Sequence, residues 1–293
     1  MSNLVEIKKR ISSITSTIKV TKVMQMIATA KIAKIKQLIP TSEKYNNYAN
    51  NILSEYIKHA LDASKIEKYY TENANNKNIL FILMSSDKGT CGSINTTIFK
   101  EITSLVHTYK QKDYNITILP IGKKATKWLE NNNDKLKITV CQMPQLVEAE
   151  NCNSSLINAV VSRIVHEYDA TTFGEICLVY HKFKNIITFN SICERLLPID
   201  KTCVKPETAK FTNIEETPEL LPTIIEFFVR TKLYNAYISN MSSIVASRMN
   251  AMDNATKNGQ EIIDDLRIKY NKGRQAAITA ELSDIVSGFE AIS

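Results

Sequence analysis

A loop of small and polar residues is the segment of this chain best suited to bind a phosphate group. It runs from Ser85 to Gly92, directly after the apolar segment Ile79–Met84 and before a helical pattern that starts near residue 95. Backbone N–H groups at such a strand-to-helix turn are well placed to hold an anion. The loop matches neither GxGxxG nor GxxxxGKS/T, the two specific nucleotide-binding patterns. We therefore predict no nucleotide site and no cofactor.

Nucleophilic, metal-binding and acid–base chemistry are also poorly supported. Cys91 lies at a helix start, a place that activates thiols as nucleophiles, but no histidine is near it in sequence. The six cysteines contain no CxxC pair, and the four histidines do not cluster with them. This pattern favours reduced, mostly buried thiols over a zinc site. Asp253 is expected on the solvated face of a long helix, so we predict no catalytic residue and no metal site.

The elements around this loop alternate between strands and helices. This alternation predicts a Rossmann-like α/β domain over residues 77–200, with an antiparallel hairpin added at one edge of the sheet. The predicted strands are Ile79–Met84, Ile116–Pro120, Ile138–Cys141, Ile176–Tyr180 and Ile186–Cys193, and the predicted helices are 95–110, 123–131 and 153–168.

The two ends of the chain carry apolar residues at alternating spacings of three and four, which is typical of a coiled-coil seam. We expect the helices of residues 1–60 and 218–293 to pair with each other as a coiled coil. Pro40 is expected to kink or briefly break the first helix, and the polar seam residues Thr21 and Gln25 to weaken the packing or fix its register. The predicted seam is Leu4, Ile7, Ile11, Ile14, Ile18, Thr21, Gln25, Ala28, Ile32, Ile35 and Ile39 with Tyr234, Ile238, Met241, Val245, Met252, Ala255, Ile262 and Leu266.

The second helix is expected to be longer than the first. At 1.5 Å per residue it would extend past its partner by roughly 25–30 Å, over Arg274–Ile292. Apolar residues occur around most of this stretch, and a helix of that kind needs burial on most of its faces. We infer that another protein surrounds the tip.

Charge and hydropathy limit the possible partners. Residues 1–40 carry eight Lys and Arg but one acid, Glu6, which favours either a solvated helix face or an acidic partner. The longest apolar runs are far too short to span a membrane, so any membrane association is expected to be peripheral.

Four segments resemble F-type ATP synthase gamma subunits. They occur in the family's order and span nearly the whole chain. The segments are residues 18–28 (IKVTKVMQMIA), 85–95 (SSDKGTCGSIN), 248–256 (RMNAMDNAT) and 270–288 (YNKGRQAAITAELSDIVSG).

The resemblance implies a non-catalytic rotor shaft. In this family the terminal helices form an antiparallel coiled coil inside a ring of three alpha and three beta subunits. The α/β domain lies at the foot, near the epsilon subunit and the membrane c-ring. Proton flow turns the ring and the shaft, and the beta subunits make or hydrolyse ATP. The resemblance implies no nucleic acid partner and no direct membrane insertion.

The resemblance also implies roles for five residues. Met24 would lie where an acidic beta loop contacts the shaft. Lys88 takes a position usually held by an arginine that pairs with a beta acid, and it keeps the charge without the two-pronged guanidinium. Arg274 and Gln275 match a pair that hydrogen-bonds a beta loop near the tip. Glu215 is a candidate contact between the foot and the c-ring.

The match begins within the first few residues, so no transit peptide is expected. This implies a peripheral protein on the cytoplasmic face of a bacterial inner membrane.

Three other classes of protein remain as alternatives. A chromosome-organising coiled-coil adapter would need a Walker A loop, which is absent. A basic coiled coil that binds nucleic acid would show salt-dependent DNA binding and would not need an apolar tip. A small-molecule α/β enzyme would need a phosphate fingerprint and would not need the long arms.

Overall fold

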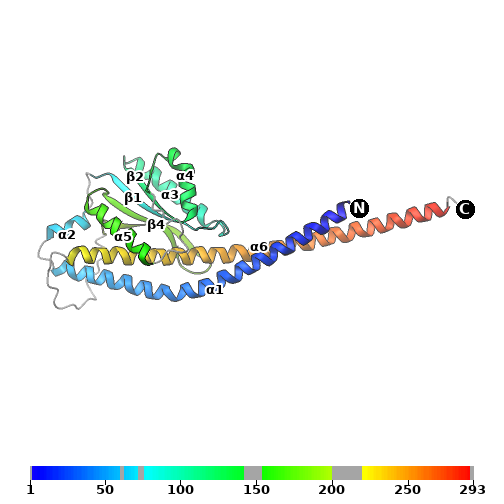
Figure 1. Cartoon of the computed structure of the whole chain (residues 1–293), viewed down its shortest axis with the longest axis horizontal. Helices are drawn as coiled ribbons and strands as arrows, with labels where there is room; N and C mark the ends of the chain where they lie inside the picture. The colour runs from blue at the N-terminus through cyan, green and yellow to red at the C-terminus, as the bar shows by residue number, and fades with distance from the viewer. Residues whose placement is uncertain (1, 60–62, 72–75, 142–153, 200–219, 291–293) are drawn as a thin grey trace. The chain divides into compact units, whose positions relative to one another are not determined.

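The computed structural model describes residues 2–59, 63–71, 76–141, 154–199 and 220–290. These divide into two compact units, one of residues 1–29 with 248–293 and one of residues 30–247, here called the terminal unit and the central unit. Two long helices, α1 (Ser2–His59) and α6 (Leu220–Glu290), contribute to both units. Figure 1 shows these two helices running in opposite directions, as the family resemblance implies.

The terminal unit is an antiparallel pair of helices. Leu4 of α1 faces Gly273 of α6, and Ile18 faces Gly259, so a step forward along α1 is matched by an equal step backward along α6. Every predicted seam position of α1 in this unit is half-buried or buried. The predicted coiled coil is therefore confirmed for α1.

The seam of α6 differs from the prediction at two positions. Ala255 and Ile262 are exposed, and their neighbours Thr256 and Ile263 face α1 instead. The prediction assigned only apolar residues of α6 to the seam, whereas this part of the seam also contains Thr256 and Gly259. Gly259 is buried because its missing side chain leaves room for Ile18.

The central unit is built on a five-stranded sheet with the order β3-β2-β1-β4-β5. All neighbouring strands are parallel except β4 and β5, which form the predicted antiparallel hairpin. The Rossmann-like fold is confirmed. The remaining elements are α2 (Ala63–Tyr70), β1 (Asn78–Met84), α3 (Ile94–Lys110), β2 (Asn115–Ile121), α4 (Lys123–Leu136), β3 (Thr139–Val140), α5 (Ser154–Asp169), β4 (Glu175–Phe183) and β5 (Phe189–Leu197).

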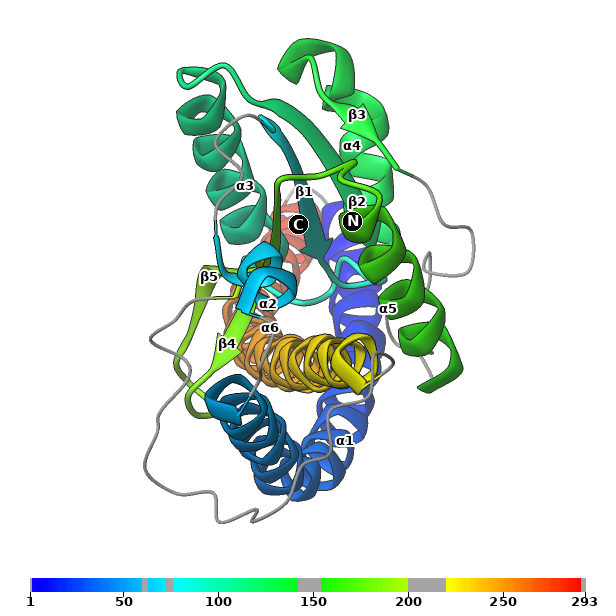
Figure 2. The same ribbon diagram turned by 90° about the vertical axis from the view of Figure 1, so that its left-hand side faces the viewer.

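Helices cover both faces of this sheet (Figure 2). Along β1, Ile79, Phe81 and Leu83 pack against α3 and α4. The alternate residues Leu80, Ile82 and Met84 share a core with α5 and with the parts of α1 and α6 in this unit. A strand buried on both faces must be apolar along its whole length, which explains the continuous apolar run of β1.

The helix α1 is not interrupted at Pro40, so the predicted break is wrong. Proline removes one backbone hydrogen bond, but packing along the rest of a helix can outweigh that loss. Apolar residues on both sides of Pro40, such as Ile32 and Leu53, are buried.

Candidate functional site

The loop after β1 is held by contacts within the chain itself. Asn95 Oδ1 accepts a hydrogen bond from the Ser86 N–H at 3.2 Å, which removes one donor that a phosphate would need. The first three N–H groups of α4 also find acceptors in this loop. These pairs are Lys123 with Asp87 Oδ1 at 3.2 Å, Lys124 with Ser86 O at 3.1 Å and Ala125 with Ser85 Oγ at 2.7 Å.

The helix α6 covers the place where a Rossmann-like domain would bind a ligand. Such sites lie at the carboxyl ends of the strands where the strand order reverses, here beside β1. Met241 and Ile244 of α6 pack there against Cys91 and Ile94. The Cys91 side chain is fully buried, which argues against a role as a nucleophile. Among the residues that the structure describes, no group of three or more His, Cys, Asp and Glu could hold a metal ion.

The same loop presents Lys88 at the surface. The Lys88 carbonyl accepts hydrogen bonds from Ser86 Oγ at 2.7 Å and from Cys91 Sγ at 3.3 Å. The backbone is thus fixed from both sides, and the Lys88 side chain is exposed. This geometry suits contact with an acidic group on another molecule.

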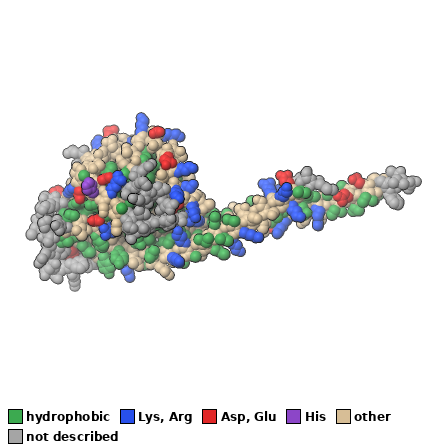
Figure 3. Space-filling view, in the orientation of Figure 1, with side chains coloured by type: hydrophobic (Ala, Val, Ile, Leu, Met, Phe, Trp, Pro, Cys, Tyr) green, Lys and Arg blue, Asp and Glu red, His purple; other side chains and the backbone are tan. Residues whose placement is uncertain are grey.

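Met24 belongs to an exposed apolar stripe on α1 of the terminal unit. The side chains of Val20, Val23, Met24 and Ile27 are 53%, 52%, 38% and 62% exposed. Their spacing of i, i+3, i+4 and i+7 places them on one helix face, which is separate from the seam. Figure 3 shows apolar and basic side chains together on the surface of this unit. Sequence analysis identified Met24 and missed its three neighbours, although their spacing was a usable signal.

A polar layer crosses the seam near Met24. The hydroxyl groups of Thr21 and Thr256 are 2.8 Å apart, and Gln25 Nε2 donates to Asp253 Oδ1 at 2.9 Å. Asp253 also pairs with Lys257 at 2.6 Å, and this partner and Gln25 lower the pKa of Asp253. The prediction that Asp253 is only a solvated face residue is therefore wrong, because its partner Gln25 lies on the opposite helix. Paired polar side chains in a seam specify register.

The far end of α6 is exposed on all sides. From residue 278 to residue 287 every side chain is exposed, including Ile278, Leu282, Ile285 and Val286 at 48–66%. Arg274 and Gln275 precede this stretch and are also exposed. The exposed stretch begins one turn later than predicted, because Ala277 is still half-buried. Glu215, the remaining predicted contact, lies outside the described residues.

His181 is a buried titratable residue that sequence analysis did not identify. Its ring Nε2 lies 3.1 Å from Thr97 Oγ1, and burial lowers its pKa to about 4. The unfolded chain would bind a proton below pH 6.5, whereas the folded chain resists it until pH approaches 4. The resulting stability is therefore complete above pH 6.5 and is lost as the pH falls towards 4.

We expect His181 to contribute about 3 kcal/mol of acid-sensitive stability to the free energy of unfolding of wild type. This contribution should be largely absent in His181→Gln. The measurement is the free energy of unfolding from denaturant titrations at several pH values between 4 and 7. Parallel pH profiles for the two proteins would contradict the prediction.

No helix in the described parts of the chain combines the length and the apolar character needed to cross a membrane.

Comparison with known families and proteins gives consistent matches over the whole chain. Residues 3–292 match the family model described as ATP synthase. A relative from Clostridium kluyveri, named ATP synthase gamma chain, is 35% identical over 291 residues, covering 99% of each chain. A relative of the same name from Pelagibacter ubique is 31% identical over 295 residues, covering all of both chains.

Solved structures with a similar fold come from mitochondrial ATP synthases. A rotor chain from Euglena gracilis covers 94% of this chain and 99% of its own length, with a TM-score of 0.60 and 14% identity. A chain from the central stalk and c-ring structure of Tetrahymena thermophila covers 80% and 99%, with a TM-score of 0.58 and 24% identity. At these identities the similarity is evidence for the fold alone.

Proposed function

The chain belongs to the ATP synthase gamma chain family, and from this premise we propose that it is the central rotor shaft of an F-type ATP synthase. As a shaft it couples rotation of a membrane c-ring to conformational changes at three beta-subunit sites, which make ATP from ADP and phosphate. The chain itself has no catalytic role in this proposal.

The exposed tip of α6 carries the proposal. A helix with large apolar side chains exposed on several faces gains stability from burial in a protein sleeve. Ile278, Leu282, Ile285 and Val286 meet this description. A ring of three alpha and three beta subunits would supply the sleeve.

The beta-subunit contacts in this proposal are Met24, Lys88, Arg274 and Gln275. The first lies in an exposed apolar stripe among basic residues, and the other three are exposed polar side chains on the loop after β1 and on α6. Their exposure in the single chain is consistent with use in contacts to other subunits. Glu215 remains a proposed contact to the c-ring, and the epsilon subunit is a further proposed partner of the central unit.

We place the complex on the cytoplasmic face of a bacterial inner membrane, with this chain as a peripheral member. Bacterial relatives aligned from end to end support this location. The functional division into a first shaft helix of residues 1–60, a foot of residues 77–200 and a second shaft helix of residues 218–293 is part of the same proposal.

The test is reconstitution with purified alpha and beta subunits. We expect ATP hydrolysis to rise strongly when this chain is added. Hydrogen bonds to charged groups contribute about 1.5–3 kcal/mol each. The double variant Arg274→Ala with Gln275→Ala should therefore lower the stimulated rate by about tenfold or more.

A matched control uses the same residue types on the same helix. Gln260 and Arg267 are exposed in the terminal unit and lie nearer the middle of α6. Gln260→Ala with Arg267→Ala should leave the stimulated rate nearly unchanged. If a folded wild-type chain does not associate with an alpha–beta ring, the rotor proposal fails.

A further inference from the structure

The strand β4 continues past the end of its neighbour β1. Pairing between these strands ends where Leu83 meets Val179, whereas β4 continues to Phe183. The backbone groups of His181 and Phe183 that face the β1 side therefore have no strand partner. Buried backbone donors and acceptors are almost always satisfied in folded proteins, so another element must supply their hydrogen bonds.

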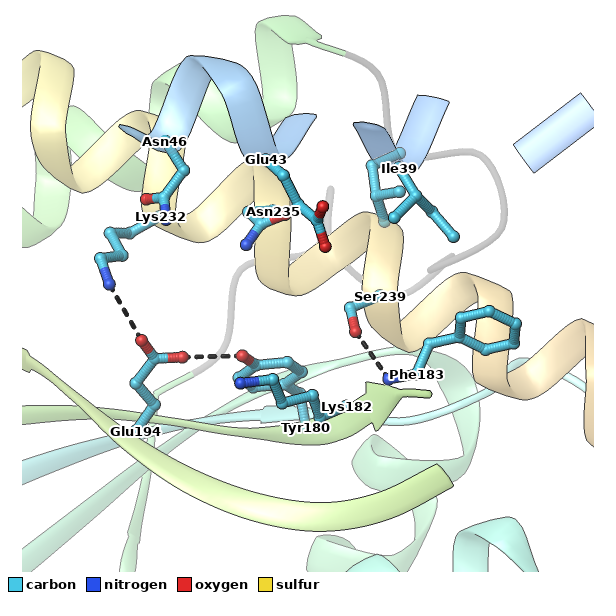
Figure 4. Close-up of a pocket in the computed structure, with 11 residues that line it drawn as sticks. Ile39, Glu43, Asn46, Tyr180, Lys182, Phe183, Glu194, Lys232, Asn235 and Ser239 are labelled. Atoms are coloured by element: carbon cyan, nitrogen blue, oxygen red, sulfur yellow. Dashed lines mark hydrogen bonds and ion pairs between the residues drawn. The ribbon is translucent and has the colours of Figure 1, made fainter. Parts of the chain in front are cut away.

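Side chains of α6 take the place of the missing strand. Asn240 Oδ1 accepts a hydrogen bond from the His181 N–H at 3.1 Å. The Ser243 hydroxyl lies 3.2 Å from the His181 carbonyl and 2.9 Å from the Ser239 carbonyl of α6, so its one hydrogen is shared between these two acceptors. Ser239 Oγ accepts from the Phe183 N–H at 2.8 Å, as Figure 4 shows. Asn240 and Ser243 are buried, so water does not compete for these bonds.

Two further contacts attach the same helix on either side of this cluster. Ser247 Oγ donates to the Cys91 carbonyl at 2.6 Å, in the loop after β1. Lys232 pairs with Glu194 of β5 at 3.1 Å, and Glu194 also accepts from the Tyr180 hydroxyl at 2.7 Å. In Figure 4 this ion pair and the Ser239 bond lie on opposite sides of a pocket of about 180 Å³.

These polar contacts differ in kind from the apolar packing around them. Apolar contact is non-directional, so it restrains the rotation and sliding of a helix less sharply than a hydrogen bond does. A hydrogen bond to a fixed backbone group weakens steeply when its angle or distance changes. Ser239, Asn240, Ser243 and Ser247, here called the α6 anchor, therefore fix both the rotation and the axial position of α6 on the sheet.

We propose that the α6 anchor carries torque between the α/β sheet and the long helix α6. This inference rests on the rotor function proposed above. Without the anchor, α6 would slip relative to the sheet under load, and part of each rotation would not be transmitted between them. The anchor residues are thus positioning residues. Ser239, Asn240 and Ser243 act through the backbone of β4, and Ser247 acts through the backbone of the loop after β1.

The test compares the triple variant Ser239→Ala, Asn240→Ala and Ser243→Ala with the matched control Ser242→Ala. Ser242 is equally buried on the same helix, but its hydroxyl donates to the Ile238 carbonyl of α6 itself at 2.7 Å. Each variant is assembled into the complete ATP synthase in membrane vesicles. The readouts are ATP hydrolysis, ATP-driven proton pumping and the amount of this chain retained in the complex.

We expect the triple variant to keep hydrolysing ATP but to lose part of its proton pumping per ATP, because three side-chain contacts between α6 and β4 are removed together. Amide hydrogen exchange at His181 and Phe183 should accelerate in the same variant. Ser242→Ala should match wild type. The single variant Ser243→Thr keeps the hydroxyl and should retain coupling that Ser243→Ala loses.

Wild-type coupling in a fully assembled triple variant would overturn the inference, and so would an equal loss of coupling in Ser242→Ala. If the triple variant fails to assemble, the pair Ser243→Ala and Ser243→Thr decides, because equal coupling in these two variants also overturns it. Failure of the wild-type chain to assemble would instead count against the rotor function.

Discussion

Replacing Gly122 with valine is expected to destabilise the central unit by about 3–5 kcal/mol. Gly122 lies between β2 and α4 with φ at +101°, a backbone conformation that side chains with a Cβ rarely adopt. A Cβ at this position would lie 2.6 Å from the Ser85 carbonyl oxygen and 2.9 Å from Ser85 Oγ. Because the carbonyl belongs to the backbone, it cannot move aside without displacing the loop after β1.

The loss should appear as a lower free energy of unfolding in denaturant titrations of the full chain. It should also disturb Lys88, because Ser85 anchors the loop through a 2.8 Å hydrogen bond from its N–H to the Ile121 carbonyl.

Gly89→Ala provides the matched control for this experiment. Gly89 is exposed in the same loop, and an added Cβ would meet only the end of the flexible Lys124 side chain at 3.3 Å. We expect the free energy of unfolding of Gly89→Ala to differ from that of wild type by no more than about 0.5 kcal/mol. Similar losses for the two variants would show that the tight approach of Gly122 to Ser85 is not what limits stability here.

The second large effect is expected at Gly259 in the terminal unit. In an isolated helix, replacing glycine with leucine would stabilise by nearly 1 kcal/mol. Here a Cβ would lie 2.8 Å from Ile18 Cγ1, on a β-branched side chain whose rotamer is restricted. The cost of overpacking then exceeds the gain in helix propensity, and we expect Gly259→Leu to lower the free energy of unfolding by about 3 kcal/mol. The measurement is the thermal loss of helical circular dichroism.

A double-mutant cycle with Ile18→Ala tests the cause of this effect. Ile18→Ala removes the side chain that the introduced leucine would meet, so Gly259→Leu should cost much less in that background. Additive losses would contradict direct contact between positions 18 and 259, and with it the register of the two helices.

Much of the fold was predictable because local patterns and the tertiary structure agree. The seam of α1 follows one spacing rule from Leu4 to Ile39, and every seam position is partly or fully buried. The run Ile79–Met84 is apolar at each residue, which matches a central strand covered on both faces. The α4 helix was predicted too short, since Asn131–Asn133 have weak helix propensity but lie within it.

Predictions for the interaction surfaces rested on motifs rather than on periodicity. The resemblance singled out Met24, Lys88, Arg274 and Gln275, and the structure places all four at the surface. Periodicity also identifies Val20, Val23 and Ile27 as one helix face, but the seam on the same helix has the longer and stronger apolar pattern.

The sequence by itself determined the long helices, the alternation of strands and helices, and the apolar tip, because these depend on spacing along one segment. Only the tertiary structure decided that Thr256 and Gly259 form the seam, that Asp253 pairs with Gln25, and that Asn240 and Ser243 complete β4. Each of these depends on the partner that lies opposite, often more than fifty residues away in the chain. A polar or missing side chain looks unfavourable in a local pattern, and becomes favourable only when the opposite element supplies a hydrogen-bonding group or the volume to fill.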